Sequence, residues 1–377
     1  MMTRVPGFRS NRVPTDYYAN AADLFTASDS TSFRNRFQRH DAHPGESLFR
    51  MPPIRLEDHL HDAFVRELRK ESPPTFVLEY HGGRCWGQAG SVVTPNNKVL
   101  AEMSYEFAPT IQQYQIFQQH ILDRPRHLPG TAILLAAPAG NVYAHFLLDI
   151  LPKLAILERA GFDWRSADHY IISGPHRTFQ AEALSLLGIE SHQVRDMSAY
   201  PHWSADRMLI PSRPGISGNY PGWAVDFVRQ LLLPLAQVPS GWNAAKVFIS
   251  RRMAGKRRII NESELFESLR PLGFQTIENE NFTFREQIGL YAAAEFVIGP
   301  MGSSTTNTLF CRPDTPVIET YSDSSVNVFT WSYGQFVPLR FAYLIGSGIV
   351  NGEHNPHEWD YRIDPAKMRA VLERLVA

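Results

Sequence analysis

Short apolar runs alternate with amphipathic segments in two long parts of the chain. In the first part, the apolar run TAILLAA at 131–137 precedes a segment with helical periodicity at 143–162. The apolar run HYIIS at 169–173 and a second helical segment at 177–189 follow it. Strands separated by single helices are typical of βαβ units around a parallel sheet. The pattern therefore predicts an α/β region here.

A second series of strands and helices begins at Lys246. Two of its helices start with sequences that favour a helix N-terminus, Asn261 followed by Glu264 and Thr283 followed by Glu286. The strands of this series are expected at 246–250, 275–278, 296–298 and 316–319. The chain thus contains two α/β series, and we expect each to form its own sheet.

The stretch at 231–246, with two Pro, a Ser-Gly pair and an Asn, is the expected linker between the two series. Residues 1–50 show no sustained period and are expected to form an irregular extension. The expected parts are therefore the extension at 1–50, an N-terminal domain at 51–238, a C-terminal domain at 239–345, and a C-terminal segment with a helix at 346–377. Two sheets joined by a linker would leave a cleft between them.

Composition supports two ordinary cores, because 44% of the 377 residues are hydrophobic. Lys and Arg (37) nearly balance Asp and Glu (38), so we expect no nucleic-acid partner. The two cysteines, Cys85 and Cys311, have no spacing typical of a disulfide framework or a zinc site, which favours a reducing compartment. The most apolar run, 132–139, is too short for a transmembrane helix, and no secretory signal is evident. These features predict a soluble, cytoplasmic protein.

The first 50 residues carry seven Arg and no Lys. Such a segment could contact an anionic membrane surface, which would place the protein at the inner membrane face. A partly ordered tail explains the same composition equally well.

A loop rich in small polar residues follows the strand at 296–298. Gly299 and Gly302 bracket it, and Ser303, Ser304, Thr305 and Asn307 open the following helix. Backbone amides and hydroxyls at a helix N-terminus favour an anion. The spacing fits neither a dinucleotide fingerprint nor a P-loop. The alternative is that the glycines only permit a tight turn.

A basic loop follows the first strand of the same domain, in the sequence ISRRMAGKRRIIN at 249–261. Its five cations are Arg251, Arg252, Lys256, Arg257 and Arg258. Loops at the carboxyl ends of parallel strands meet at one edge of the sheet, so this loop should face the Gly302 loop. Arginine suits a diphosphate, and we expect Arg251, Arg252 and Lys256 to bind one. The alternative is a set of solvated surface charges.

These segments resemble glycosyltransferase family 61. The resemblance rests on YAHFLLDILPKL, ISRR, RRIINESEL, TFREQIGLYAAAEFVIGPMGSSTTNTLF and PVIE, which agree in order and spacing. It spans roughly residues 85–345 and is strongest over 141–154 and 247–320. It implies a GT-B architecture of two Rossmann-like domains and an inverting, metal-independent hexosyl- or pentosyltransferase. The second domain would bind a nucleotide-sugar donor, and no separate cofactor is expected.

The chain departs from the family pattern at one position of the loop. The family usually has a histidine where this chain has Met301. Methionine cannot donate a hydrogen bond to a phosphate or a sugar hydroxyl, so the identity of the donor and the activity itself are open. No D-x-D sequence occurs, which agrees with neutralisation of the diphosphate by arginines.

The acid–base candidates lie in the helix at 143–162. His145 and Asp149 are four residues apart and share one helical face, with Lys153 one turn further. An inverting transfer needs one base to deprotonate the acceptor hydroxyl, and either residue could serve. A local pair within a packed helix is the alternative. Glu319, at the end of PVIE, is expected to accept hydrogen bonds from a ribose, and a simple surface carboxylate is the alternative.

The combined hypothesis is a glycosyltransferase that moves a sugar from a UDP-type donor to an oligosaccharide or polysaccharide acceptor in surface or capsular glycan synthesis. Two alternatives remain from the sequence. One is a GT-B-like epimerase that acts on the nucleotide sugar, and the other is a non-catalytic protein that binds it.

Overall fold

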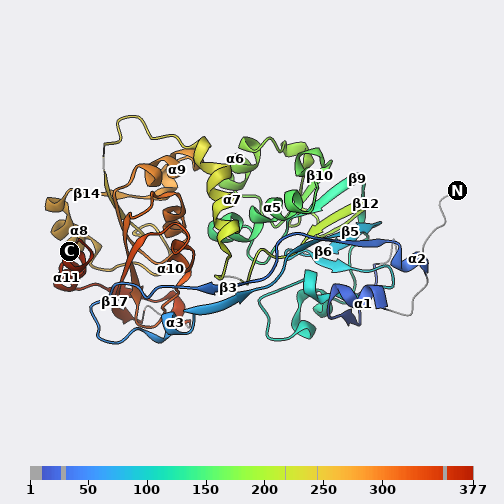
Figure 1. Ribbon diagram of the computed structural model, residues 1–377, viewed down its shortest axis with the longest axis horizontal. Helices are drawn as coiled ribbons and strands as arrows, with labels where there is room; N and C mark the ends of the chain where they lie inside the picture. The colour runs from blue at the N-terminus through green and yellow to red at the C-terminus, as the bar shows by residue number, and fades with distance from the viewer. Residues whose placement is uncertain (1–10, 27–30, 217, 244, 351–354, 377) are drawn as a thin grey trace. The chain divides into compact units, whose positions relative to one another are not determined.

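The computed structural model describes residues 11–26, 31–216, 218–243, 245–350 and 355–376, and they form two compact units (Figure 1). Unit 1 contains the described residues up to Gly45 together with Pro73–Pro214. Unit 2 contains Glu46–Ser72 and the described residues from Gly215 onward. The expected boundaries at 50/51 and 238/239 are therefore not the boundaries of these units. The chain leaves unit 1 near Pro214, before the expected linker at 231–246.

The N-terminal part of the chain is not an irregular extension. β1 (Tyr17–Tyr18) pairs with β8 (Val99–Leu100), and β2 (Phe37–Asp41) pairs with β5 (Phe76–His81). α1 (Ala21–Thr26) and α2 (Thr31–Arg34) lie between these strands along the chain. Buried side chains such as Leu24, Phe33 and Phe37 join them to the core of unit 1, which the sequence did not suggest because their spacing is irregular. Residues 1–10 of the expected extension lie outside the described residues.

The sheet of unit 1 is mixed, and β12 lies at its centre. β12 (His202–Pro211) pairs in parallel with β9 (Arg126–Leu134) and antiparallel with both β5 and β6 (Arg84–Trp86). β10 (His169–Ile172) and β11 (Val194–Asp196) extend the parallel side beyond β9. β7 (Ser91–Val93) joins β6 to β8. The parallel strands β9 and β10 are those predicted from the alternating pattern.

The predicted helix at 143–162 forms in three pieces. α4 (Tyr143–His145) continues into the π-helical turn η4 (Phe146–Ile150) and then into α5 (Pro152–Arg159). Pro152 begins α5 at a position where a missing amide hydrogen costs little. The second predicted helix is α6 (Thr178–Leu186).

Unit 2 contains a doubly wound sheet in the order β14-β13-β15-β16-β17-β18. The first five strands are parallel, and β18 pairs antiparallel with β17. The strands are β13 (Lys246–Ile249), β14 (Phe274–Ile277), β15 (Phe296–Pro300), β16 (Pro316–Ser322), β17 (Arg340–Ile349) and β18 (Asp360–Arg362). In chain order the five parallel strands lie as 2-1-3-4-5, which is a common order of doubly wound folds. The α/β class and the parallel sheet are thus as expected.

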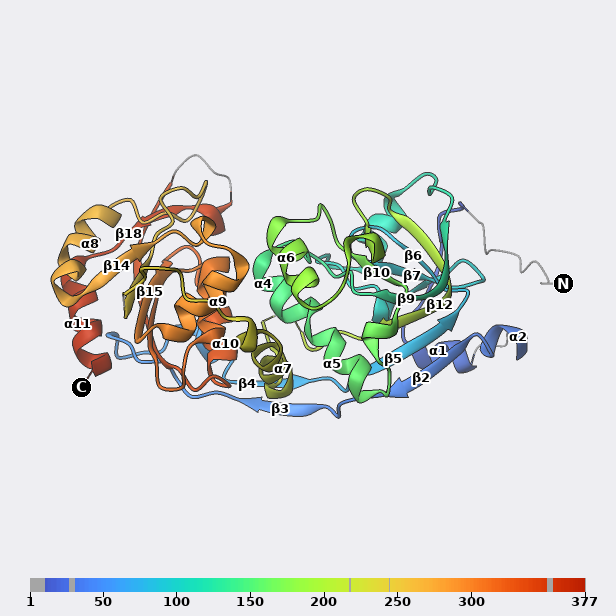
Figure 2. The ribbon, with the colours of Figure 1, turned by 90° about the horizontal axis from the view of Figure 1, so that it is seen from above.

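Helices cover both faces of this sheet. α8 (Glu262–Leu269) and α11 (Pro365–Val376) lie together on one face, and α9 (Phe284–Ala293) and α10 (Phe329–Gly334) lie on the other (Figures 1 and 2). The fully buried side chains of Phe248 and Leu265 belong to one core cluster. The C-terminal segment at 346–377 therefore completes this unit, although its residues 351–354 and 377 lie outside the described residues.

A segment from the N-terminal half of the chain also belongs to unit 2. β3 (Glu46–Phe49) and β4 (Arg69–Ser72) form a hairpin that encloses α3 (Asp62–Val65). The Phe64 ring of α3 stacks on Tyr343 and meets Trp331 edge-on. α7 (Gly222–Leu232) is the remaining α-helix of this unit.

Short 3-10 helices occur in both units, at Ala101–Met103, Ile111–Gln113, Gln115–Gln118, Trp164–Ser166, Ser191–Gln193, Leu233–Leu235, Arg270–Leu272, Asn279–Asn281, Ser303–Phe310 and Pro356–Glu358.

One of the two expected helix caps forms as predicted. The Thr283 hydroxyl accepts from the amide of Glu286, whose carboxylate accepts from Thr283 in return. Asn261 precedes α8 but makes no side-chain cap, because its amide group binds the backbone of Ile363 instead. In the described part of the chain, no helix is both long and apolar enough to cross a membrane.

Candidate functional site

The loops after β13 and β15 leave neighbouring strands of unit 2. These two strands pair directly, while β14 lies on the other side of β13, so the direction of winding changes between them. In open α/β sheets, ligands bind beyond the carboxyl ends of the strands at such a change. The basic loop follows β13, and the Gly302 loop follows β15, as the sequence predicted.

Three of the five cations in the basic loop form ion pairs within unit 2. Arg252 pairs with Glu278, and Lys256 pairs with Glu358. Arg258 contacts Asp360 through Nε at 3.0 Å and Nη2 at 2.7 Å. The positive charges of these three residues are therefore compensated by nearby carboxylates.

Arg251 is placed differently from these three residues. Its guanidinium lies against Gly302, where an added Cβ would be 2.3 Å from Nη1. Its Nη2 donates to the carbonyl of Lys256 at 3.3 Å, and its buried Nε has no hydrogen-bond partner among the described residues. Burial lowers the pKa of Arg251, and the charge of Arg257 lowers it further. The charged form is thus held at a cost that a bound anion would offset.

Arg257 is the second cation without a carboxylate in ion-pair contact among the described residues. It has a positive φ of 57°, and its buried Nε has no hydrogen-bond partner in the same range. Burial lowers its pKa, although Tyr361, Glu358 and Glu319 act to raise it. The sequence analysis counted Arg257 among the five cations of the basic loop but did not select it as a diphosphate contact. The sequence alone does not show which of these cations form ion pairs. The ion pairs of Arg252 and Lys256 make Arg257 the better candidate for the diphosphate contact that we propose beside Arg251, and the expected roles of Arg252 and Lys256 there stay predictions.

The Gly302 loop supplies the neutral side of this site. Ser303 and Ser304 are half-buried at the start of the 3-10 helix Ser303–Phe310. Thr305 is buried, and its hydroxyl donates to Glu319 at 2.7 Å. Asn307 is buried and donates to Gln287 at 3.0 Å. The side chains of Thr305 and Asn307 thus support the loop from inside, and their expected contact with the donor stays a prediction.

Glu319 is enclosed rather than exposed at a strand end. It lies within β16, which continues to Ser322, and only 1% of the residue is exposed. Its carboxylate accepts from the hydroxyls of Thr305, Thr330 and Tyr321. Burial raises its pKa to about 7, against the lowering effect of these hydroxyls and of Arg257. Glu319 therefore holds the Gly302 loop, and its expected contact with a ribose stays a prediction.

Met301, which replaces the histidine typical of the family, is buried beside this site with 9% of its surface exposed. Its backbone amide donates to the carbonyl of Thr320 at 2.9 Å. The side chain thus packs in unit 2 and adds no polar group to the loop.

The acid–base candidates lie in unit 1. His145 Nδ1 is 2.6 Å from Asp149 Oδ2, and both side chains are partly exposed, 21% and 15% respectively. Asp149 belongs to the π-helical turn, a feature that is frequent at functional sites. With Asp149 ionised, Nδ1 carries the proton of this hydrogen bond, and Nε2 becomes the basic nitrogen. The predicted contact between His145 and Asp149 is therefore present, and their role as a base stays a prediction.

Lys153 continues the row of His145 and Asp149 into the interior. Only 5% of it is exposed, and its ammonium donates to the carbonyls of Leu135 and Ala136 at 3.1 and 2.7 Å, just after β9. Burial lowers its pKa to about 7, while Asp149 raises it. Lys153 thus fixes the helix at the carboxyl end of β9. In the sequence, the spacing of four residues between Asp149 and Lys153 indicated that Lys153 lies on the same helical face.

Within the residues that the structure describes, no three His, Cys, Asp or Glu side chains gather as a metal site. Both cysteines are buried and free. Metal independence of the reaction stays a prediction.

The sequence model of the family described as Glycosyltransferase 61 matches residues 143–318. The matched segment includes the His145–Asp149 pair, the basic loop and the Gly302 loop. This match supports the assignment of the chain to glycosyltransferase family 61 and confirms the resemblance carried by these segments. The comparison with curated proteins gives no match.

Proposed function

We propose that this glycosyltransferase moves a sugar from a UDP-type donor to a glycan acceptor, with inversion at the anomeric carbon and without a metal ion. The observation that carries the proposal is the pair of half-buried arginines, Arg251 and Arg257, whose Nε atoms have no hydrogen-bond partner among the described residues, in the loop beside the change of winding in the sheet of unit 2. Two such cations beside a loop with the half-buried hydroxyls of Ser303 and Ser304 suit a diphosphate. The family match supports a sugar as the transferred group.

In the proposed reaction, the acceptor hydroxyl attacks the anomeric carbon from the face opposite the diphosphate. The His145–Asp149 pair accepts the proton of that hydroxyl. Arg251 and Arg257 stabilise the negative charge that develops on the leaving diphosphate, which is the largest charge change in the reaction. The resemblance to the family supports a GT-B arrangement, in which these two groups would serve one donor and one acceptor.

The wider setting is part of the same proposal. Synthesis of a surface or capsular polysaccharide in the cytoplasm would supply the acceptor. The two free buried cysteines agree with a reducing compartment.

Incorporation of labelled sugar from a panel of nucleotide sugars into oligosaccharide acceptors tests the proposal. We expect release of the nucleoside diphosphate only when an acceptor is present, and a product with inverted anomeric configuration. A changed sugar in the absence of an acceptor would indicate an epimerase instead. Tight donor binding without turnover against a broad acceptor panel would indicate a non-catalytic binding protein, the alternative suggested by Met301.

A further inference from the structure

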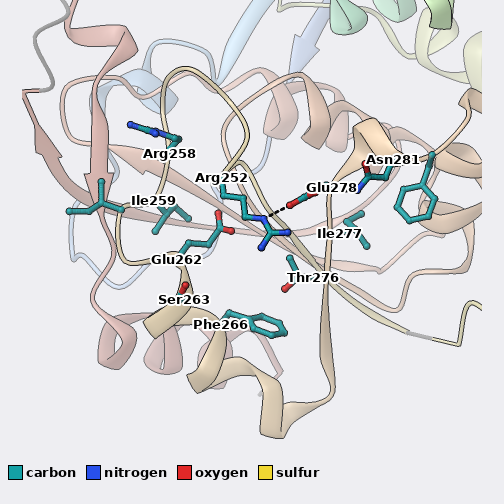
Figure 3. Close-up of a pocket in the computed structure, with 12 residues that line it drawn as sticks. Arg252, Arg258, Ile259, Glu262, Ser263, Phe266, Thr276, Ile277, Glu278 and Asn281 are labelled. Atoms are coloured by element: carbon teal, nitrogen blue, oxygen red, sulfur yellow. Dashed lines mark hydrogen bonds and ion pairs between the residues drawn. The ribbon is translucent and has the colours of Figure 1, made fainter.

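A cavity of about 670 Å³ opens beside the basic loop of unit 2 (Figure 3). It lies between the first turns of α8 and the end of β14. Its apolar lining includes Phe266, Ile277 and Phe282, and its polar lining includes Arg252 and Glu278. The volume falls within the range of roughly 300–1,000 Å³ that is usual for small-molecule sites. Aromatic rings with a few polar groups are also the usual lining of such sites.

This cavity is continuous with the residues around Arg251. Glu262 lines the cavity, and its carboxylate accepts from the backbone amide of Arg251 at 3.2 Å and from the hydroxyl of Ser250. Arg252, the next residue, points into the cavity, where it meets Glu278 (Figure 3). A ligand whose diphosphate lies at Arg251 therefore has a space of suitable size for its next group directly beside it.

Glu278 is a polar group of this cavity that can accept a hydrogen bond from such a ligand. Its side chain is 15% exposed and is held on both oxygens, by Arg252 Nε on Oε1 and by Asn281 Nδ2 at 3.1 Å on Oε2. A carboxylate offers about four acceptor positions, so two protein partners leave capacity for a ligand donor. Because an ionised carboxylate only accepts, it favours a ring N–H over a ring nitrogen with a lone pair.

We propose that this cavity binds the nucleoside of the donor and that Glu278 accepts a hydrogen bond from a ring N–H of its base. Uracil and guanine present such an N–H between carbonyl or amino groups, whereas cytosine and adenine present an acceptor at the equivalent position. Arg252 then serves the nucleoside by positioning Glu278, instead of binding the diphosphate. The inference rests on the proposed function, because it assumes that the diphosphate binds at Arg251.

A substitution that fills the cavity tests the location. Ser263 lines the cavity from the exposed surface of α8, so Ser263→Trp should occupy the space without disturbing the core. Glu267→Trp, at an exposed position of the same helix that does not line the cavity, is the matched control. Calorimetric titration should show UDP affinity reduced at least about tenfold by Ser263→Trp and inorganic pyrophosphate affinity unchanged. The control should change neither affinity.

A comparison of nucleotides tests the role of Glu278. The unmodified protein should bind UDP or GDP at least about tenfold more tightly than CDP and ADP, since a site built around a hydrogen bond rejects a ligand that cannot make it. Glu278→Gln should reduce this preference, because an amide can also donate to a ring acceptor. Equal affinity of the unmodified protein for all four nucleotides would overturn the proposed role of Glu278.

Different results would contradict the placement of the nucleoside and the proposed function. Binding of UDP that is insensitive to Ser263→Trp, with pyrophosphate still bound, would overturn only the placement of the nucleoside in this cavity. Absence of binding for pyrophosphate and for every nucleoside diphosphate would overturn the proposed function itself, and the inference with it.

Discussion

The candidate acid–base residues of unit 1 and the two candidate diphosphate-binding arginines of unit 2 differ in their hydrogen-bond partners. In unit 1, the buried ammonium of Lys153 has two carbonyl acceptors, and His145 and Asp149 bind each other. In unit 2, Arg251 and Arg257 each bury an Nε without a hydrogen-bond partner among the described residues. These three residues of unit 1 thus lie in a fixed arrangement, while Arg251 and Arg257 of unit 2 carry charge that no carboxylate contacts among the described residues.

This difference agrees with the part of the transfer reaction that we propose for each unit. A proton acceptor needs a defined geometry and a partner that orients it, as the His145–Asp149 pair provides. A site for a diphosphate needs positive charge that is not already neutralised by carboxylates, because bound carboxylates would compete with the ligand. The basic loop holds two buried nitrogens without a hydrogen-bond partner among the described residues, Arg251 Nε and Arg257 Nε, and such groups call for a ligand or another explanation.

The largest expected effect concerns the unit 1 pair. Asp149→Asn should lower the transfer rate by about 10² to 10⁴, or about 3–5 kcal/mol in the barrier, because asparagine cannot accept a proton or favour the charged imidazole. Donor affinity should stay nearly unchanged, since the proposed donor contacts lie in unit 2. The assay should follow sugar incorporation rather than nucleotide release.

His145→Ala provides the comparison for that variant. An equal loss of rate would identify His145 and Asp149 as one functional unit, and a deeper loss would identify His145 as the base. Unmodified turnover by both Asp149→Asn and His145→Ala would place the base outside this helix and would remove the proposed role of unit 1.

A second effect comes from the buried carboxylate of unit 2. Because the pKa of Glu319 is raised to about 7, the folded protein holds its proton at pH values where the unfolded chain has released it. This contribution to stability is present below pH 4.5 and is lost as pH rises through about 7, by up to about 3 kcal/mol. Glu319→Gln should remove that pH dependence.

Urea unfolding at pH 5 and pH 8 measures this effect. The unmodified protein should have a lower free energy of unfolding at pH 8 than at pH 5. In Glu319→Gln, the difference between the two pH values should be smaller. An identical difference in the two proteins would show that Glu319 is ionised throughout this range.

A third and smaller effect concerns the contact between the two loops of unit 2. Gly302 has an extended backbone, with φ of 170°, so alanine is compatible with its conformation. An added Cβ would displace the guanidinium of Arg251, whose Nη1 would lie only 2.3 Å away. Gly302→Ala should therefore weaken UDP binding by about 1–2 kcal/mol with little change in stability, because a flexible side chain can move aside.

Titration of UDP and thermal unfolding, performed on the same preparation of Gly302→Ala, separate the two quantities. Unchanged UDP affinity would show that the position of Arg251 against Gly302 is not required for binding. Gly255→Ala is a suitable control, because an added Cβ there would meet no heavy atom within 4 Å.

The smallest expected effect is that of chelation. If arginines stabilise the leaving diphosphate, EDTA should leave turnover unchanged. Loss of activity that returns with Mg²⁺ or Mn²⁺ would contradict the metal-independent mechanism.

The sequence predicted the parts of the fold that depend on local pattern. The alternating strands and helices, the Thr283 cap and the neighbouring loops of unit 2 all follow from residues close together in the chain. The spacing of His145 and Asp149 likewise predicted their contact, because four residues correspond to about one helical turn.

The features that the sequence did not predict depend on distant residues. Arg258 meets a carboxylate 102 positions away, and this contact is what distinguishes it from Arg257. β1 and β2 join the sheet of unit 1 through partners more than 30 positions further along the chain. Glu319 appeared to end a strand because Thr320, Tyr321 and Ser322 are polar or aromatic, yet all three continue β16 and are buried.

Titration of inorganic pyrophosphate into Arg251→Ala and Arg257→Ala tests the central claim most directly, since pyrophosphate lacks both the sugar and the nucleoside. Each substitution should weaken binding by about 1.5–3 kcal/mol, or roughly 10- to 150-fold, as expected for a charge-assisted contact. Arg270→Ala, which removes an exposed arginine of the same unit paired with Glu267, should leave the affinity unchanged. Unchanged pyrophosphate affinity in both site variants would contradict the account.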